Sequence, residues 1–278
     1  MLSATTVDRL RARFGPDAQS WLDGVPALVS RLASRWGLEI VAKMTGGTSV
    51  TLRCRRSDGS GAYLKLTPDA GVFAEEAAAL RAWADCPAVV SLLDAADDDN
   101  ALLIEALEPG TPLTDWRPAV SVLAQLRDVP PVAGFATVAD RVDFMFGLAA
   151  RRNPGLPAAL LDASHAAARR LADTGTVVRL VHGDLHPANV LTSARGAVAI
   201  DPRPSLGDPD LDVVDWAFLD VSTTSQLHSR IAALHVLDED RAYEWSRALA
   251  VLMLMSHVRR GVEDASTALF RQLAESLA

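Results

Sequence analysis

Cysteine and lysine are scarce in this chain, and it has no long apolar run. Only two cysteines, Cys54 and Cys86, occur among 278 residues. Two cysteines form neither a zinc-ligand spacing nor a disulfide framework, so we expect buried or idle thiols. The longest apolar run, Ala248 to Met255, is far too short to cross a bilayer and indicates a core helix. With no N-terminal signal pattern, these features predict a cytoplasmic protein that does not act at a membrane.

A surplus of positive charge is also missing. The formal net charge is −8 and the sequence pI is about 5.2, which argues against nucleic acid as a partner and would suit a cationic small molecule. The composition, 49% hydrophobic and 22% charged, is that of a globular protein. The length is enough for one large domain or two modest ones. The oligomeric state stays open, and a monomer is consistent with the sequence.

The first part of the chain predicts helices followed by an antiparallel sheet. Apolar residues recur at helical spacing over residues 3–36, with a break at Gly15-Pro16 that divides them into two helices. Short alternating runs and turn-forming segments then predict strands, and residues 72–84 return to the helical period. The expected strands are residues 39–41, 50–54, 62–66, 89–93 and 102–107. This gives a five-stranded sheet with one inserted helix.

The pattern changes after Glu108-Pro-Gly-Thr-Pro112, beyond which the chain is mostly helical. We therefore predict an α+β fold with an N-terminal domain over residues 1–107 and a C-terminal domain over residues 108–278. The exception to the helices is a hairpin, in which two short apolar runs flank the turn at residues 193–196 and Asp201 ends the second strand. Such a hairpin would bring Asp184, Asn189 and Asp201 to one end. Their oxygen atoms suit Mg²⁺.

Lys65 is one of only two lysines, the other being Lys43, in a chain rich in arginine. Alternation in the predicted strand places Lys65 on the face opposite Leu64 and Leu66. A compact ammonium there suits the phosphates of a nucleotide, although a solvated strand lysine explains the residue equally well when it is taken alone. The glycine turn between the first two predicted strands could let backbone N–H groups approach phosphates, or it could be only a turn. Its residues are Gly46, Gly47, Thr48 and Ser49.

The stretch from His182 to Asp201 is more specific. Asp184, then Asn189, then a strand that ends at Asp201 offers a base for a hydroxyl proton and two metal ligands in the order that phosphoryl transfer requires. His182 and His186 could instead join Asp184 as ligands of a transition-metal hydrolase. No second cluster of ligands completes that alternative in the sequence.

Two segments carry a resemblance to a known family. They are Val181-His-Gly-Asp-Leu-His-Pro-Ala-Asn-Val-Leu191 and Ala199-Ile-Asp-Pro-Arg-Pro-Ser-Leu-Gly-Asp-Pro209. Both resemble the aminoglycoside phosphotransferase family, which has a protein-kinase-like bilobal fold. The second segment, with Arg11-Ala-Arg-Phe-Gly15 and Trp21-Leu-Asp23, is most similar to the streptomycin 6-kinase and hydroxyurea kinase subgroup. Pro-Arg follows Asp201 where protein kinases have Phe-Gly, which favours a small-molecule kinase.

The resemblance implies a role for each matching residue. Asp184 would be the catalytic base, and Asn189 with Asp201 would hold Mg²⁺. Lys65 would bind the α and β phosphates of ATP or GTP, with Glu76, or else Glu75, as its ion-pair partner. The phosphate loop would be the glycine turn already described. The adenine would lie against Ile104 and the backbone groups of Glu105 and Leu107, and His182 would support the shape of the loop.

The expected acceptor is a small hydroxylated molecule, most plausibly an aminoglycoside such as streptomycin. Asp215 and Trp216 are candidates for contact with it, because the acidic residues after Asp201 could bind cationic groups. By the resemblance, Asp208 and Asp212 would instead brace the catalytic loop and start a helix. The alternatives are a metabolic kinase for a sugar, choline-like or amino-alcohol acceptor, and a pseudokinase, against which the complete set of expected site residues argues.

Overall fold

The computed structural model describes residues 4–15, 18–44 and 49–278. It divides into two compact units. The first comprises Met1–Thr111 and Thr192–Arg195, and the second Pro112–Leu191 and Gly196–Ala278. The division thus falls after residue 111, where the sequence placed it after residue 107. The assignment of Thr192–Arg195 to the first unit was not predicted.

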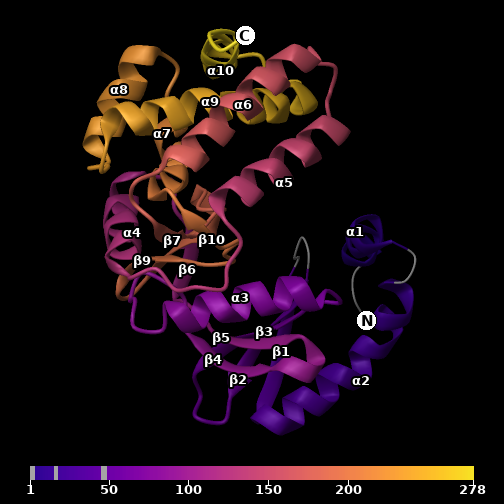
Figure 1. The fold of residues 1–278 in the computed structure, drawn as a ribbon. Helices are drawn as coiled ribbons and strands as arrows, with labels where there is room; N and C mark the ends of the chain where they lie inside the picture. Colours follow the sequence, from indigo (N-terminus) through magenta and orange to yellow (C-terminus); the bar gives the residue numbers. More distant parts are fainter. Residues whose placement is uncertain (1–3, 16–17, 45–48) are drawn as a thin grey trace. The chain divides into compact units, whose positions relative to one another are not determined.

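In its described residues, the first unit is a five-stranded antiparallel sheet with three α-helices (Figure 1). The strand order is β1-β2-β3-β5-β4, and each strand is antiparallel to its neighbours. The mixed fold class and the sheet predicted from the sequence are confirmed. In chain order the elements are α1 (Ala4–Phe14), α2 (Ala18–Trp36), β1 (Leu38–Met44), β2 (Val50–Arg56), β3 (Gly61–Leu66), α3 (Ala70–Ala82), β4 (Leu92–Ala96), the short 3₁₀ helix η1 (Asp97–Asp99) and β5 (Ala101–Glu105).

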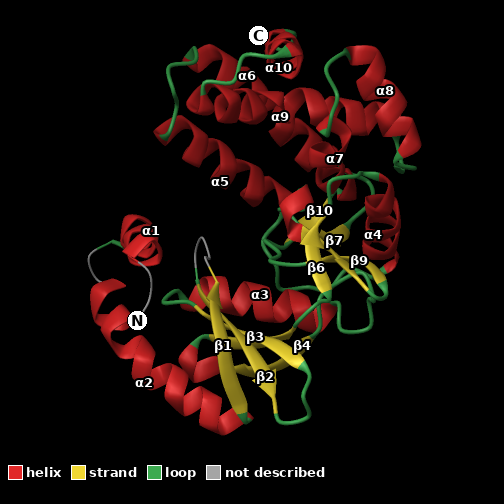
Figure 2. Cartoon of the chain, turned by 180° about the vertical axis from the view of Figure 1, so that it is seen from behind, coloured by secondary structure: helices red, strands yellow, loops and turns green. Residues whose placement is uncertain are grey.

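Successive side chains of β3 point to opposite faces of the sheet. Leu64 and Leu66 are fully buried and join a core that includes Leu22 and Leu32 of α2, and each such leucine contributes about 1.5–3 kcal/mol of stabilisation. Lys65 lies between them in sequence and therefore points to the other face of the sheet. Figure 2 shows the sheet from behind, with α2 running along it.

One predicted strand is displaced in the structure. Residues 89–93 were expected to form a strand, but β4 starts at Leu92. Val89 and Val90 are buried in the preceding loop. Their apolar character therefore reflects burial. A short apolar run indicates a buried segment, and it does not by itself show that the segment is a strand.

The second unit is mostly helical, as predicted, and contains the hairpin of β8 and β9. Two small sheets have the orders β10-β7 and β6-β8-β9. By the division given above, residues 109–111 of β6 and 192–193 of β8 are assigned to the first unit. Residues 108–112, expected only to break the pattern, include the short strand β6. The strands are β6 (Pro109–Pro112), β7 (Arg179–Val181), β8 (Val190–Ser193), β9 (Gly196–Ala199) and β10 (Ser205–Gly207), with the 3₁₀ helices η2 (Pro187–Asn189) and η3 (Pro209–Val213). The helices are α4 (Arg117–Asp128), α5 (Val138–Arg151), α6 (Ala158–Thr174), α7 (Val214–Phe218), α8 (Thr224–Ala233), α9 (Glu239–Arg260) and α10 (Ala265–Glu275).

The apolar run of residues 248–255 lies within α9, where Ala248, Val251 and Leu254 are fully buried. This confirms the predicted core helix. Among the described residues, no helix has the length and apolar character needed to span a membrane. Cys54 and Cys86 are free and buried, as expected, and burial raises the pKa of the Cys54 thiol.

Candidate active site

Lys65 and Glu76 form a close ion pair in the first unit. The Lys65 Nζ donates to both carboxylate oxygens of Glu76, at 2.7 Å each. The side chains are 11% and 3% exposed, so the two charges are largely removed from water. Removal of either partner would leave a buried, unpaired charge, which is strongly destabilising. Glu75, the other candidate partner, is exposed. Residues of β3 and α3 thus fix the ammonium in one place, as a phosphate-binding lysine requires.

Glu105, the last residue of β5, is held by partners that were not predicted. The Glu105 carboxylate accepts hydrogen bonds from the Arg195 guanidinium and, at 2.7 Å, from the Ser91 N–H. Burial alone would raise the pKa of Glu105, but these hydrogen bonds outweigh it and the net effect lowers the pKa. The N–H of Glu105 donates to the Ser91 carbonyl oxygen at 3.1 Å. The N–H of Glu105, one of the backbone groups expected to face the adenine, is therefore already engaged.

Arg195 is a residue that the sequence reasoning missed. It belongs to the turn between β8 and β9, and its guanidinium also donates to the carbonyl oxygens of Pro87 and Val89. No local signal marks it, because its partners lie about a hundred residues earlier in the chain. Ile104 and Leu107, the other expected adenine contacts, are buried.

The expected phosphate loop falls largely outside the described residues. Gly46, Gly47 and Thr48 are among the residues whose positions are not described. Ser49 is described and buried, and its hydroxyl lies 3.2 Å from that of Thr51.

In the second unit, the loop after β7 brings Asp184 and Asn189 together. The Asn189 side-chain nitrogen donates to the Asp184 carbonyl oxygen at 2.9 Å and to its carboxylate at 3.3 Å. The Ile200 N–H donates to the Asn189 carbonyl oxygen at 2.9 Å, so the residue before Asp201 is tied to the same turn. Asp201 has a left-handed backbone, with φ 58°, and its carboxylate is 3.9 Å from Arg203. The hairpin therefore gathers the three expected residues in one region.

The buried carboxylate of Asp212 fixes the shape of this loop. It accepts the N–H of His182 at 2.6 Å and the N–H of Gly183 at 2.8 Å. Burial raises the pKa of Asp212 to about 6, against the opposing effect of these two hydrogen bonds. The bracing role that the resemblance implied for Asp212 agrees with this geometry.

His182 supports the loop and does not exchange protons near neutral pH. Its ring is fully buried, and Nε2 lies 3.0 Å from the Ile200 carbonyl oxygen. Burial lowers the pKa of His182 to about 4. A metal centre that uses this histidine is also unsupported, because the described residues contain no group of three His, Cys, Asp or Glu side chains able to hold a metal.

Gly183 allows the loop to pass close to the segment that follows Asp201. Its φ is 74°, and a Cβ added there would lie 2.1 Å from the Arg203 carbonyl oxygen. The Arg203 N–H donates to the His182 carbonyl oxygen at 2.8 Å. The catalytic loop and the segment of Asp201 are thus packed backbone to backbone, which only glycine permits.

Asp208 is structural, and Trp216 is not a surface residue. The Asp208 carboxylate caps η3 by accepting the Asp210 N–H, and it also accepts the Trp245 Nε1–H at 2.7 Å and a hydrogen bond from Arg241. The Trp216 side chain is fully buried. The prediction that Trp216 contacts the acceptor is therefore wrong, because an aromatic residue beside acidic residues can equally belong to the core.

Asp215 remains near the expected catalytic carboxylate. Burial raises its pKa to about 6, His186 opposes that rise and Asp184 adds to it. His186, for which the resemblance implied no role, therefore lies close enough to Asp215 to affect its pKa.

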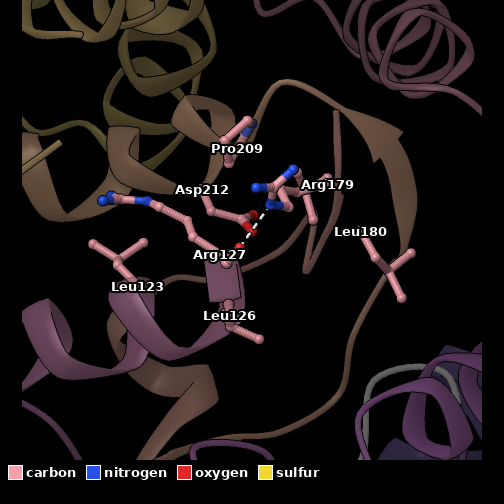
Figure 3. Close-up of a pocket in the computed structure, with 8 residues that line it drawn as sticks. Leu123, Leu126, Arg127, Arg179, Leu180, Pro209 and Asp212 are labelled. Atoms are coloured by element: carbon pink, nitrogen blue, oxygen red, sulfur yellow. Dashed lines mark hydrogen bonds between the residues drawn. The ribbon is translucent and has the colours of Figure 1, made fainter. Parts of the chain in front are cut away.

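Two cavities lie near the loop, and they differ greatly in volume. One, of about 10 Å³, is lined by α4, β7 and η3 residues that include Arg127, Arg179 and Asp212 (Figure 3). It has room for little more than one water molecule. The other, of about 260 Å³, lies between α5 and α9 and is lined in part by Asp184. Only the second can hold a small molecule beside the expected base.

The donor set fits Mg²⁺. Asn189 uses its amide nitrogen toward Asp184, which leaves the amide oxygen as the atom able to bind a cation. Asp201 supplies a carboxylate that is 38% exposed. Mg²⁺ is commonly held by one or two such protein oxygens, together with water and phosphates.

Comparison with known proteins decides the family. The family model described as "Aminoglycoside/hydroxyurea antibiotic resistance kinase" matches residues 35–261. The chain belongs to this family. A protein named streptomycin 6-kinase from Streptomyces glaucescens is 31% identical to this kinase over 282 residues, covering 92% of this chain and 89% of the relative. A hydroxyurea phosphotransferase from Kitasatospora aureofaciens is 32% identical over 272 residues, covering 91% and 79%.

Solved structures show that the fold of this kinase is protein-kinase-like. The choline kinase LicA from Streptococcus pneumoniae matches with a TM-score of 0.66 at 15% identity, over 90% of this chain and 97% of that one. The macrolide 2'-phosphotransferase MphH from Brachybacterium faecium matches with a TM-score of 0.57 at 19% identity, over 92% and 98%. At these identities the likeness concerns the fold alone. The family match confirms a phosphotransferase of the antibiotic-resistance type, and a metabolic kinase is not favoured.

Proposed function

We propose that this kinase transfers the γ-phosphoryl group of ATP, with Mg²⁺, to a hydroxyl group of a small antibiotic molecule. The observation that supports it most is the position of Asp184, whose carboxylate is ordered by Asn189 and lines a cavity of about 260 Å³. A base must lie within reach of the hydroxyl from which it takes a proton. The cavity provides a place for that hydroxyl.

In the proposed reaction, the acceptor oxygen forms a bond to the γ-phosphorus while the bond from that phosphorus to the bridging oxygen of ADP breaks. Asp184 orients the hydroxyl and receives its proton. The products are ADP and a phosphate ester. Bound Mg²⁺ would neutralise charge on the phosphate oxygens, and Asn189 and Asp201 would hold it.

The first unit supplies the residues that we propose for the nucleotide. Lys65, fixed by Glu76, would bind the α and β phosphates. Ile104, Leu107 and the carbonyl group of Glu105 would contact the adenine. The preference for ATP over GTP is a proposal to be tested with both nucleotides.

Streptomycin and hydroxyurea, named by the relatives, are the first acceptors to test. We expect ADP release that depends on Mg²⁺ and on an acceptor, and we expect Asp184→Asn to reduce kcat by at least about a hundredfold. Asp162→Asn, an exposed change on α6, is the matched control and should leave kcat unchanged. If Asp184→Asn retained the activity of the unaltered protein, the assignment of the base would be wrong.

A further inference from the structure

A side chain of α5 holds the catalytic loop directly beside the expected base. The guanidinium group of Arg141, near the start of α5, donates from Nη2 to the Gly183 carbonyl oxygen at 2.9 Å. Its Nε lies 3.7 Å from the place that a Cβ on Gly183 would occupy. The Gly183 carbonyl group and the Asp184 N–H belong to one planar peptide unit. This hydrogen bond therefore fixes the peptide plane that ends at the Asp184 Cα.

Gly183 is held at both of its polar backbone groups. Its N–H donates to the Asp212 carboxylate of η3 at 2.8 Å, and its carbonyl oxygen accepts the hydrogen bond from Arg141. Each partner carries a charge, and such hydrogen bonds are roughly twice as strong as those between neutral groups. Because glycine has more backbone freedom than other residues, the position of the following Asp184 depends on these contacts.

The backbone that carries Arg141 is tied to the small sheet from which the loop emerges. Thr137 and Asp140 form a capping box at the start of α5. The Leu206 N–H of β10 donates to the Ala136 carbonyl oxygen at 2.7 Å. β10 is paired with β7, the strand that leads into the loop. Arg141 therefore reaches the loop from a helix end that is hydrogen-bonded to the same sheet.

We propose that Arg141 is a positioning residue of the phosphotransfer reaction, which acts through the Gly183 carbonyl group to hold the Asp184 carboxylate in one place. This inference rests on the proposed function, in which Asp184 is the base. A guanidinium group keeps its proton in proteins, so Arg141 supplies a fixed donor and takes no part in proton transfer. Arg141 and Asp184 line the same cavity, so the base is held on the side from which the acceptor would approach.

Two variants separate the donor from the bulk of the side chain. Arg141→Met keeps a long apolar stem near Phe144 but removes the guanidinium group, and Arg141→Lys restores a charged donor. We expect kcat for acceptor-dependent ADP release by the full chain to fall about tenfold to a hundredfold in Arg141→Met, because misplacement of a reacting group by about 1 Å costs on the order of a hundredfold. Arg141→Lys should recover part of that loss. The KM for ATP should stay unchanged in both variants, since the pair of Lys65 and Glu76 is untouched.

Arg151→Met is the matched control. It removes the same type of side chain from the exposed last position of the same helix. Arg151 is not among the described residues that line the cavity. This variant should keep full kcat, so an equal loss in Arg151→Met and Arg141→Met would overturn the proposal.

Chemical rescue distinguishes positioning from a role in folding alone. Arg141→Ala is assayed with millimolar guanidinium chloride, far below denaturing concentrations, and with sodium chloride at equal ionic strength. Guanidinium should raise kcat per nucleotide-binding site, counted by calorimetric titration with ADP, and sodium should not. A folding defect would lower the number of binding sites and leave kcat per site unchanged. That result, or a loss of kcat that neither lysine nor guanidinium relieves, would contradict the role of Arg141.

If Arg141→Met does not fold, Arg141→Lys takes its place. A crystal structure of that variant shows whether the ammonium group reaches the Gly183 carbonyl oxygen. The kcat should be kept with this contact and lost without it, and the opposite combination would refute the proposal.

A crystal structure of Arg141→Met gives a readout that needs no acceptor. The Asp184 carboxylate should be displaced or should occupy more than one position, whereas a single unchanged position would overturn the inference. Absence of ADP release from the unaltered protein with every acceptor would instead contradict the proposed function. The two failures are therefore distinguishable.

Discussion

Replacement of Gly183 by alanine should damage both stability and catalysis. The added Cβ would lie 2.1 Å from the Arg203 carbonyl oxygen, so one of the two backbones must move by about 0.9 Å to reach the shortest contact that real Cβ atoms show. The left-handed φ of 74° costs alanine about 1–2 kcal/mol, and the steric conflict adds about 1–3 kcal/mol. We expect the free energy of unfolding to fall by about 2–5 kcal/mol.

The same displacement should slow the reaction more than it weakens binding of the nucleotide. Gly183 precedes Asp184, and Arg203 lies two residues after Asp201, so movement of either backbone shifts a proposed site residue. Misplacement of a reacting group by about 1 Å can cost on the order of a hundredfold in rate. The assays are urea unfolding and the kcat of acceptor-dependent ADP release.

Gly261 offers the matched control. Its φ of 66° is close to that of Gly183, and a Cβ added there meets no heavy atom within 4 Å. Gly261→Ala should lose only the backbone term, about 1–2 kcal/mol, and should keep full activity. If Gly183→Ala matched Gly261→Ala in both stability and kcat, the close packing of the two backbones would contribute to neither.

Two further predictions concern Asp210 and Arg195. Burial raises the pKa of Asp210 to about 6, so the folded state binds this proton more tightly than the unfolded chain, and stability should fall as the pH rises from about 4 through about 6. Asp210→Asn should reduce that fall by about 2 kcal/mol in urea unfolding at a series of pH values; an unchanged slope would contradict the assignment. Arg195→Ala should free the Glu105 carboxylate and raise the KM for ATP by about three- to tenfold with little change in melting temperature. Arg53→Ala, which removes the exposed ion pair with Glu108, is its control, and an equal KM in the two variants would refute the role of Arg195.

Local patterns predicted the parts of the site that lie near one another in sequence. Strand alternation placed Lys65 away from the leucine core, and the paired apolar runs predicted the hairpin that gathers Asp184, Asn189 and Asp201. These features depend on periods of two residues and on short turns, which a sequence displays directly. The ion pair of Lys65 with Glu76 was also within reach, since the two residues are only 11 positions apart.

Contacts across long separations could not be predicted in this way. The ties of Arg195 to Val89 and of Asp212 to His182 join residues 106 and 30 positions apart, and no local pattern marks either pair. Trp216 failed for a related reason, because its surroundings in the fold, and not its neighbours in sequence, decide whether an aromatic side chain is buried.

The four residues Thr192–Arg195 also affect how the protein is made. They belong to the first unit, yet during synthesis they follow the whole of residues 112–191. The sheet of β1 to β5 can leave the ribosome long before the guanidinium that holds Pro87, Val89 and Glu105 exists. Because closing so long a loop carries an entropic cost that local contacts do not, the arrangement of Pro87, Val89 and Glu105 around Arg195 would be a late step in the folding of the first unit, completed only when about half of the second unit has been synthesised.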